Sequence, residues 1–244
     1  MQMNNDKRFA VLIDADNVSD RYIRHIFDEL ANEGIVTYRR IYGDWTKPAL
    51  GSWKNVLLNY SITPIQQYSY TTGKNATDSA MIIDAMDILY SHSVEGFCLV
   101  SSDSDFTKLA SRLKESGMTV IGMGERKTPP PFVNACNKFK YLESISGDAL
   151  PDSKTHGSEV SGTMSTDDVR NAITGILDEI SDEDGWALLS EIGNILVKRC
   201  PSFDVRNYGF SKLTPYVKSL NSFEIDSVPS ANGSVKYIYI RRKQ

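Results

Sequence analysis

Short apolar runs alternate with amphipathic stretches over about the first 145 residues of the chain. Residues 9–13 and 97–100 are apolar throughout, as strands buried on both faces of a sheet are, whereas residues 21–32 repeat apolar side chains at helical spacing. The pattern predicts strands at 9–13, 35–42, 61–68, 96–100 and 119–123, and helices at 21–32, 51–59, 77–90, 105–115 and 131–137. This alternation indicates an α/β domain with a mostly parallel sheet and helices on both faces.

The pattern changes after residue 146. Residues 147–165 are small and polar without a hydrophobic period, so we interpret them as a linker between domains at 1–146 and 166–244. Two or three helices are predicted within 167–220, followed by strands near 223–227 and 235–241 with a turn around Asn232-Gly233. Helices followed by a hairpin of this kind suggest a winged helix-turn-helix domain.

Composition and charge narrow the class of protein only moderately. The 244 residues carry a formal net charge of -4, which argues against a broad basic surface for nucleic acid but allows a local basic groove. Three widely spaced cysteines without a CxxC pair indicate neither a disulfide framework nor a zinc site. The first residues lack the apolar core of a signal peptide, and no apolar run approaches the roughly 20 residues that span a membrane. We therefore expect a cytoplasmic protein without a membrane partner.

Four aspartates stand where the predicted sheet would bring them together. Asp14 closes the first apolar run, Asp103 and Asp105 follow the run 97–100, and Asp78 opens a predicted helix. The carboxyl ends of parallel strands share one crevice, and carboxylates crowded there repel one another unless a cation neutralises them. The pattern favours a divalent metal site and phosphate chemistry. The alternative is that each aspartate caps a helix or compensates its dipole, since Asp is a favoured N-cap residue.

Three other polar residues, Asn17, Asp84 and Asp16, allow more than one interpretation. Asn17 could hold a carboxylate or orient a metal-bound water, or it could form an Asx-turn at the strand end. Asp84 lies about 9 Å along the helix from Asp78 and is expected to support the site indirectly or to face solvent. Asp16 could be a ligand, a cap or a solvated residue, and Thr77 is a candidate N-cap for the helix 77–90.

Three sequence blocks in this order resemble the NYN domain, a branch of the PIN-like nucleases: IDADN at 13–17, KNATD at 74–78 and SSDSDF at 101–106. The resemblance covers about residues 7–145 and implies a PIN-like three-layer α/β/α fold and ribonuclease activity. It also implies that Mg²⁺ or Mn²⁺ is held by four aspartates with the assistance of one amide: Asp14, Asp78, Asp103, Asp105 and Asn17. The family often has Gly-x-Asp in the second block, whereas here the glycine stands at position 73.

Basic and aromatic side chains are mixed between residues 38 and 54, as in proteins that bind single strands by phosphate contacts and base stacking. Alternation puts Tyr38, Arg40 and Tyr42 on one side of their strand, and Tyr38 and Trp53 are expected in the core. The candidates for RNA binding in this domain are Arg40, Trp45, Lys47, Lys74, Arg126 and Lys127. The last two are equally interpretable as solvated residues beside a proline-rich loop.

The C-terminal part resembles the LOTUS (OST-HTH) domain over about residues 166–243, on the segments Gly185–Ser190, 201–204, 208–213 and 223–225. Without that resemblance, the large side chains of this part indicate mainly a folded core: Trp186, Leu189, Phe203, Phe210 and Leu213. The resemblance implies a winged helix that binds RNA or a protein partner. Lys212 and Arg241 are candidates for phosphate contacts, with a solvated basic face as the alternative.

Taken together, these patterns predict a metal-dependent ribonuclease with an RNA-binding winged-helix module. One alternative is a non-catalytic RNA-binding or adaptor protein with a degenerate nuclease fold. A second is a phosphatase of the haloacid dehalogenase type, because Asp14-Ala15-Asp16 follows the first strand and Asp14 could form an aspartyl-phosphate. In this hypothesis the RNA is either single-stranded or structured, and the sequence leaves a homodimer open.

Overall fold

A computed structural model of the chain describes residues 6–68, 76–147, 163–229 and 236–243. The chain forms two compact units, Met1–Ala149 and Leu150–Gln244, which are described separately below. No helix in these described ranges is long and apolar enough to cross a membrane.

The first unit is built on one six-stranded sheet in which every pair of neighbouring strands is parallel. Its strands are β1 (Arg8–Asp14), β2 (Ile35–Gly43), β3 (Thr63–Gln66), β4 (Gly96–Val100), β5 (Thr119–Gly124) and β6 (Lys138–Tyr141). Their order across the sheet is β3-β2-β1-β4-β5-β6. The chain order therefore reverses between β1 and β4, and a crevice for ligands lies outside the carboxyl ends of the strands at such a point.

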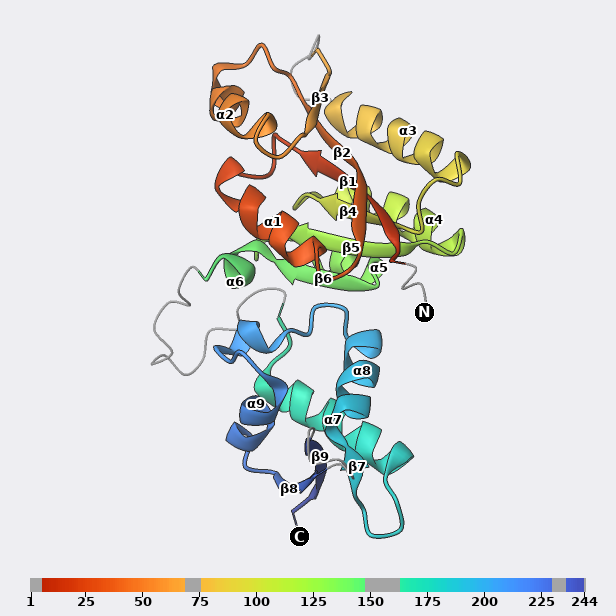
Figure 1. The fold of residues 1–244 in the computed structure, drawn as a ribbon, viewed down its shortest axis with the longest axis vertical. Coiled ribbons are helices and arrows are strands. Elements are labelled where there is room, and N and C mark those ends of the chain that lie inside the picture. Colours follow the sequence, from red (N-terminus) through yellow and green to blue (C-terminus); the bar gives the residue numbers. More distant parts are fainter. Residues whose placement is uncertain (1–5, 69–75, 148–162, 230–235, 244) are drawn as a thin grey trace. The chain divides into compact units, whose positions relative to one another are not determined.

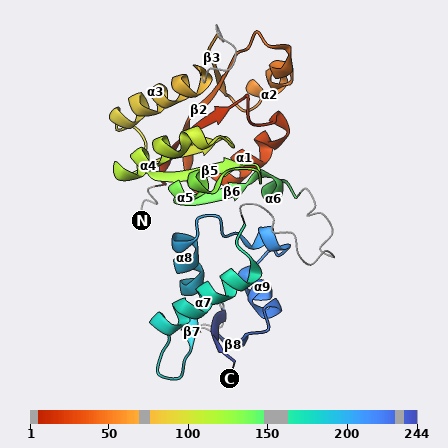
Figure 2. The same cartoon turned by 180° about the vertical axis from the view of Figure 1, so that it is seen from behind.

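Helices cover both faces of this sheet, as Figures 1 and 2 show from opposite sides. One face carries α3 (Ala76–Tyr90), α4 (Thr107–Glu115) and α5 (Pro130–Ala135). The other carries α1 (Ile23–Leu30), α2 (Lys54–Leu57) and α6 (Leu142–Ser146). The predicted three-layer α/β/α arrangement with a parallel sheet is thus confirmed.

The central strands are apolar throughout because both of their faces are buried. In β1, Ala10 and Leu12 pack toward α3 and α4, whereas Val11 and Ile13 pack toward α1, and all four have no exposed surface. Alternation also holds in β2, where Tyr42 belongs to the first of these cores and Ile41 to the second. Each of these apolar runs therefore forms a buried strand, and the carboxyl end of that strand lies at the edge of the crevice.

Several of the predicted helices and strands begin or end at other residues than predicted. The predicted helices 21–32 and 105–115 each begin with a short 3₁₀ turn, at Asp20–Tyr22 and Ser104–Phe106. The predicted helix 51–59 is instead a 3₁₀ turn at Pro48–Trp53 followed by one turn of α-helix. The helical segment begins earlier than predicted because Pro48 has its φ angle fixed near the helical value. The predicted strand 61–68 shrinks to four residues in β3.

Two further predictions fail at short elements. No strand was predicted for the residues before Tyr141, yet Lys138–Tyr141 forms β6 at the edge of the sheet. Its four residues alternate between lysine and buried aromatic, too short a pattern to identify a strand. Thr77 does not cap α3, because the helix already includes Ala76.

The second unit contains three α-helices and a small antiparallel sheet among its described residues. The helices are α7 (Thr166–Ile180), α8 (Leu189–Arg199) and α9 (Leu213–Ser219). The strands β7 (Ala187–Leu188), β8 (Phe223–Pro229) and β9 (Lys236–Arg242) pair in the order β7-β9-β8. This arrangement agrees with the predicted winged helix, while the predicted turn at Asn232-Gly233 lies outside the described residues.

The core of the second unit differs from the prediction at one aromatic residue. Leu189 and Phe203 are buried, and Phe210 and Leu213 are partly buried against the same core. Trp186 is only half-buried and lies instead against the guanidinium of Arg241, 4.7 Å from the ring centroid. The aromatic pattern could not distinguish a core tryptophan from one that packs under a basic side chain at the surface.

Candidate metal centre

The end of β1 delivers a buried carboxylate to the crevice. Asp14 is 1% exposed, and its Oδ2 accepts hydrogen bonds from Asn17 Nδ2 and Ser101 Oγ, each at 2.7 Å. Its Oδ1 accepts a bond of 3.1 Å from the backbone N–H of Asp16. Burial nevertheless raises the pKa of Asp14 above its usual value, against the opposing effect of these hydrogen bonds. Asp14 is therefore a fixed, strongly held carboxylate.

Ser101 also belongs to this site, although it was not among the predicted site residues. It directly follows β4, has no exposed surface, and joins the ends of β1 and β4 through its bond to Asp14. Its hydroxyl oxygen also accepts a bond of 3.1 Å from the backbone N–H of Asp103. The available signal was a polar residue immediately after a fully buried strand, which is costly unless that residue has partners.

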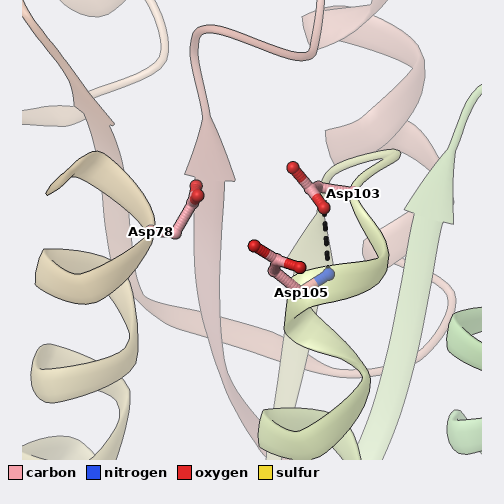
Figure 3. Close-up of side chains that lie close together, drawn as sticks. All are labelled: Asp78, Asp103 and Asp105. Atoms are coloured by element: carbon pink, nitrogen blue, oxygen red, sulfur yellow. Dashed lines mark hydrogen bonds between the residues drawn. The ribbon is translucent and has the colours of Figure 1, made fainter. Parts of the chain in front are cut away.

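Asp78, Asp103 and Asp105 form the acidic cluster of this crevice. Each offers one carboxylate oxygen, and the three oxygens lie within 4.8 Å of one another. Figure 3 shows the three side chains converging from the first turn of α3, from the loop after β4 and from the start of the following helical turn. Asp14 does not belong to this group of oxygens.

Asp103 acts as a helix cap and also lies in the acidic cluster. Its Oδ1 accepts a bond of 2.9 Å from the backbone N–H of Asp105, and Asp103 is the N-cap of the turn at Ser104–Phe106. Since a carboxylate has two oxygens, capping with one leaves the other for a different partner. The cap interpretation and the ligand interpretation of this residue are therefore compatible.

The electrostatics of the cluster favour a cation. Burial first, and then the nearby carboxylates, raise the pKa of Asp78 from its usual 3.8 to about 6. The carboxylates responsible are those of Asp14, Asp103, Asp105 and Asp16. Oxygen ligands at this spacing match the preference of hard cations such as Mg²⁺ and Mn²⁺, and a bound cation would remove the repulsion. The residues present thus fit a divalent metal ion.

Asp16 and Thr77 connect the β1 loop to α3. The exposed Asp16 accepts a bond of 3.2 Å from the Thr77 hydroxyl and pairs with Lys47 Nζ at 3.4 Å. Thr77 thus contacts the site by its side chain, although it does not cap the helix. Lys47, one of the predicted RNA-binding residues, is thereby linked through Asp16 to Thr77, the residue before Asp78.

Asp84 is removed from the cluster and has its own partners. It forms an ion pair with Arg40 and accepts a hydrogen bond from the Tyr42 hydroxyl. Arg40 also lies over the ring of Tyr38, 5.2 Å from its centroid. The predicted RNA-binding residue Arg40 is therefore engaged in a partly buried network that joins β2 to α3.

The remaining predicted RNA-binding residues of this unit are dispersed. Trp45 is partly buried and donates its indole N–H to the Ile65 carbonyl at 3.1 Å. Arg126 donates its backbone N–H to the Glu143 carboxylate and its guanidinium to Ser144 Oγ, at 3.0 and 3.1 Å respectively. Lys127 pairs with Glu125 at 2.7 Å. Lys74 lies outside the described residues.

The basic candidates of the second unit lie on different elements. Lys212 is exposed and immediately precedes α9. Arg241 lies on β9, where it pairs with Glu224 at 2.7 Å in addition to its contact with Trp186. In the second unit, therefore, the guanidinium of Arg241 lies over the Trp186 ring and is also paired with a carboxylate.

Comparison with known families agrees with this architecture. The family model described as the NYN domain matches residues 8–143, which include the whole acidic cluster. The chain belongs to the NYN family. A second model, the OST-HTH/LOTUS domain, matches residues 165–235. An NYN domain is thus followed by a LOTUS domain, and the two together point to a nuclease-like protein with an RNA-binding module.

Two solved structures are similar to the chain, and the first of them supports its fold. A crystal structure of a protein of unknown function from Vibrio parahaemolyticus is 20% identical, with a TM-score of 0.50, over 59% of this chain and 98% of that chain. A solution NMR structure of an uncharacterized protein from Nitrosomonas europaea is 32% identical over 39% of this chain and 89% of that one, with a TM-score of 0.28. None of the curated proteins matches the chain.

Proposed function

We propose that the NYN domain of this chain is a ribonuclease that depends on Mg²⁺ or Mn²⁺. The observation that carries the proposal is the convergence of Asp78, Asp103 and Asp105 within 4.8 Å at the point where strand order reverses. The raised pKa of Asp78 supports it, because clustering these acids is unfavourable without a cation. Family membership supports nuclease chemistry at this place.

In this proposal, residues of the chain bind the metal ion and fix the orientation of the carboxylate beside it. Asp78, Asp103 and Asp105 would bind the metal ion, while Asp14 adds negative charge from the buried layer beneath. Asn17 and Ser101 keep Asp14 in one orientation through their bonds to its Oδ2. When bound, the divalent ion would supply Lewis-acid stabilisation of the charge that develops on the phosphate.

The proposed reaction is hydrolysis of an RNA phosphodiester bond. Water adds to phosphorus as the bond to the 3′-oxygen breaks, so one product ends in a 3′-hydroxyl and the other in a 5′-phosphate. The water supplies the proton that the leaving oxygen gains, and no covalent enzyme intermediate is required. Lys47, held beside the site by Asp16, would contact a substrate phosphate.

The LOTUS domain would capture the same RNA. Trp186 and Arg241 offer a ring and a cation on one surface of this domain, and Lys212 offers a second cation. We propose that the tether between the domains raises the effective concentration of captured RNA at the metal centre, provided that the segment 147–165 acts as a linker.

The decisive experiment compares the wild type with Asp103→Asn on labelled single-stranded and structured RNAs, in Mg²⁺, Mn²⁺ or EDTA. Asparagine is as good an N-cap as aspartate, so the turn at Ser104–Phe106 should survive while a ligand charge is lost. The matched control is Glu115→Gln, which removes an exposed charge on α4.

We expect metal-dependent cleavage in the wild type and in Glu115→Gln, and a loss of 100-fold or more in Asp103→Asn, about the effect of removing one strong electrostatic contribution. Manganese binding, measured by electron paramagnetic resonance, should weaken in parallel. Full cleavage by Asp103→Asn would contradict the proposed site. RNA binding without cleavage in any metal would instead support a non-catalytic adaptor.

A further inference from the structure

Two exposed basic residues follow the acidic cluster along α4. Lys108 and Arg112 lie on this helix, three and seven residues after Asp105. At 1.5 Å per residue they stand about 4.5 and 10.5 Å from Asp105 along the helix axis. At 100° per residue they lie within about 60° of it around the axis. One side of α4 therefore carries a candidate metal ligand at its start and two cations beyond it.

Two contacts show that this side of α4 is turned toward α3. Asp105 shares the acidic cluster with Asp78 in the first turn of α3, and Arg112 donates to the hydroxyl of Tyr90 at the other end of α3, at 3.4 Å. Lys114 lies on the opposite side of α4 and contacts the C-cap of α5 instead. Figure 2 shows α3 and α4 as neighbours on one face of the sheet. We call the surface formed by Lys108, Arg112 and Tyr90 the α4 strip.

The groups of the α4 strip have weak partners or none within the described part of the chain. Lys108 forms no hydrogen bond or ion pair there. Arg112 lies 3.8 Å from Glu115, an exposed pair within one helix that contributes little. Tyr90 is 62% exposed, and its ring contacts no other described aromatic ring. Two cations and an aromatic ring are therefore accessible to a ligand that leaves the acidic cluster in this direction.

We propose that the α4 strip binds the RNA strand on one side of the scissile phosphate, and that the strand is unpaired there. Lys108 and Arg112 would contact phosphates, and the Tyr90 ring would stack on a base that no complementary strand occupies. A stacked strand advances about 3.4 Å per nucleotide, so Arg112 would meet about the third phosphate from the cut, or a nearer one in an extended strand. The inference rests on the proposed ribonuclease function, because the strip is defined relative to the bond that is cut.

The first test measures cleavage of a labelled single-stranded RNA by the double variant Lys108→Gln/Arg112→Gln. We expect KM to rise about 10-fold, as for two exposed ion pairs worth about 3-fold each, with kcat unchanged because the contacts are the same in substrate and transition state. The logarithmic salt dependence of KM should fall by about 1.4, or 0.7 for each lost phosphate contact. The matched control is Arg24→Gln, which removes an exposed, helix-paired arginine from α1 on the opposite face of the sheet and should change neither quantity.

Two further measurements separate lost phosphate contacts from damage to the fold. Manganese binding, followed by electron paramagnetic resonance, should not weaken in the double variant, because neither residue is a candidate ligand. The exchange Lys108→Arg/Arg112→Lys keeps both charges and should restore KM and its salt dependence. Failure of this exchange to restore them, or equal effects of Arg24→Gln, would overturn the proposal.

The outcomes also distinguish this proposal from the nuclease on which it rests. Cleavage that is lost in Asp103→Asn but unchanged in KM and salt dependence in the double variant would overturn the α4 strip and leave the nuclease intact. Absence of cleavage in every metal would contradict the nuclease itself. The strip is then decided by equilibrium binding of the same RNA, in which the double variant should again lose affinity and salt dependence.

The unpaired state of the strand is tested with one RNA, used alone and annealed to its complement. We expect the wild type to bind and cleave the single strand at least 5-fold better, and Tyr90→Ala to lose about 5-fold on it, the lower value of one base stacked on an aromatic ring. Tyr90→Phe keeps the ring without the hydroxyl and should retain wild-type behaviour. Equal use of both RNAs, or an unchanged Tyr90→Ala, would overturn the proposal.

Discussion

Replacing Asp78 with asparagine should make the metal-free NYN domain more stable at neutral pH. The folded state raises the pKa of Asp78 from 3.8 to about 6, so ionising this residue costs more in the folded than in the unfolded chain. Two pKa units correspond to about 3 kcal/mol, which is a ceiling because water and the neighbouring acids relax. We expect Asp78→Asn to gain half of that or more in EDTA at pH 7.5.

The gain in stability from Asp78→Asn should depend on pH, in a direction set by the raised pKa of Asp78. Between pH 4 and 6 the folded state holds a proton on Asp78 that the unfolded state has lost, so the stability of the wild type falls as pH rises through this window. The gain in Asp78→Asn should therefore vanish near pH 4 and reach its full size above pH 6. Saturating Mn²⁺ should stabilise the wild type, by about 2.7 kcal/mol at 100 times the dissociation constant, but not the variant.

The assay is urea unfolding followed by tryptophan fluorescence in a Trp186→Phe background. The chain has three tryptophans, and the remaining two, Trp45 and Trp53, both report on the NYN domain. Glu115→Gln serves as the control for removing an exposed charge. If Asp78→Asn were less stable than its parent in EDTA at pH 7.5, or if the difference were the same at pH 4, repulsion within the acidic cluster would not destabilise the metal-free fold.

Three other predictions concern residues around the site and on the LOTUS domain. Ser101→Ala should lower the free energy of unfolding by about 1–3 kcal/mol in urea, because buried Asp14 loses one of its donors; an unchanged midpoint would contradict that role. A double-mutant cycle of Arg40→Gln with Asp84→Asn should give a coupling near 1 kcal/mol, and zero coupling would show that the pair is not formed. In an Asp103→Asn background, Arg241→Ala should weaken RNA binding and reduce the salt dependence of that binding by about one ion, as measured by fluorescence anisotropy. The control variant Arg199→Ala should change neither quantity. Equal effects of the two variants would exclude a specific phosphate contact by Arg241.

The sequence was most informative where the geometry of parallel strands constrains it. Asp14 and Asp103 each follow a buried apolar run, and this pattern predicted both at the same edge of the sheet because neighbouring parallel strands end together. The Arg40–Asp84 pair could not be foreseen, since 44 residues separate its members and nothing local links them. Ser101 was missed for a different reason. It stands in a run of three serines and two aspartates, 101–105, any of which could cap a turn, and its bond to Asp14 is formed only in the folded chain.

The bond from Ser101 to Asp14 spans 87 residues of sequence, and it crosses the boundary between the two halves of the sheet. The first half contributes Asp14, and the second contributes both Ser101 and the acidic pair that follows it. A nascent chain that has folded only through β3 would therefore lack Asp103 and Asp105. Any chemistry at the acidic cluster therefore requires both halves of the sheet, and a fragment that ends at β3 could not form the cluster at all.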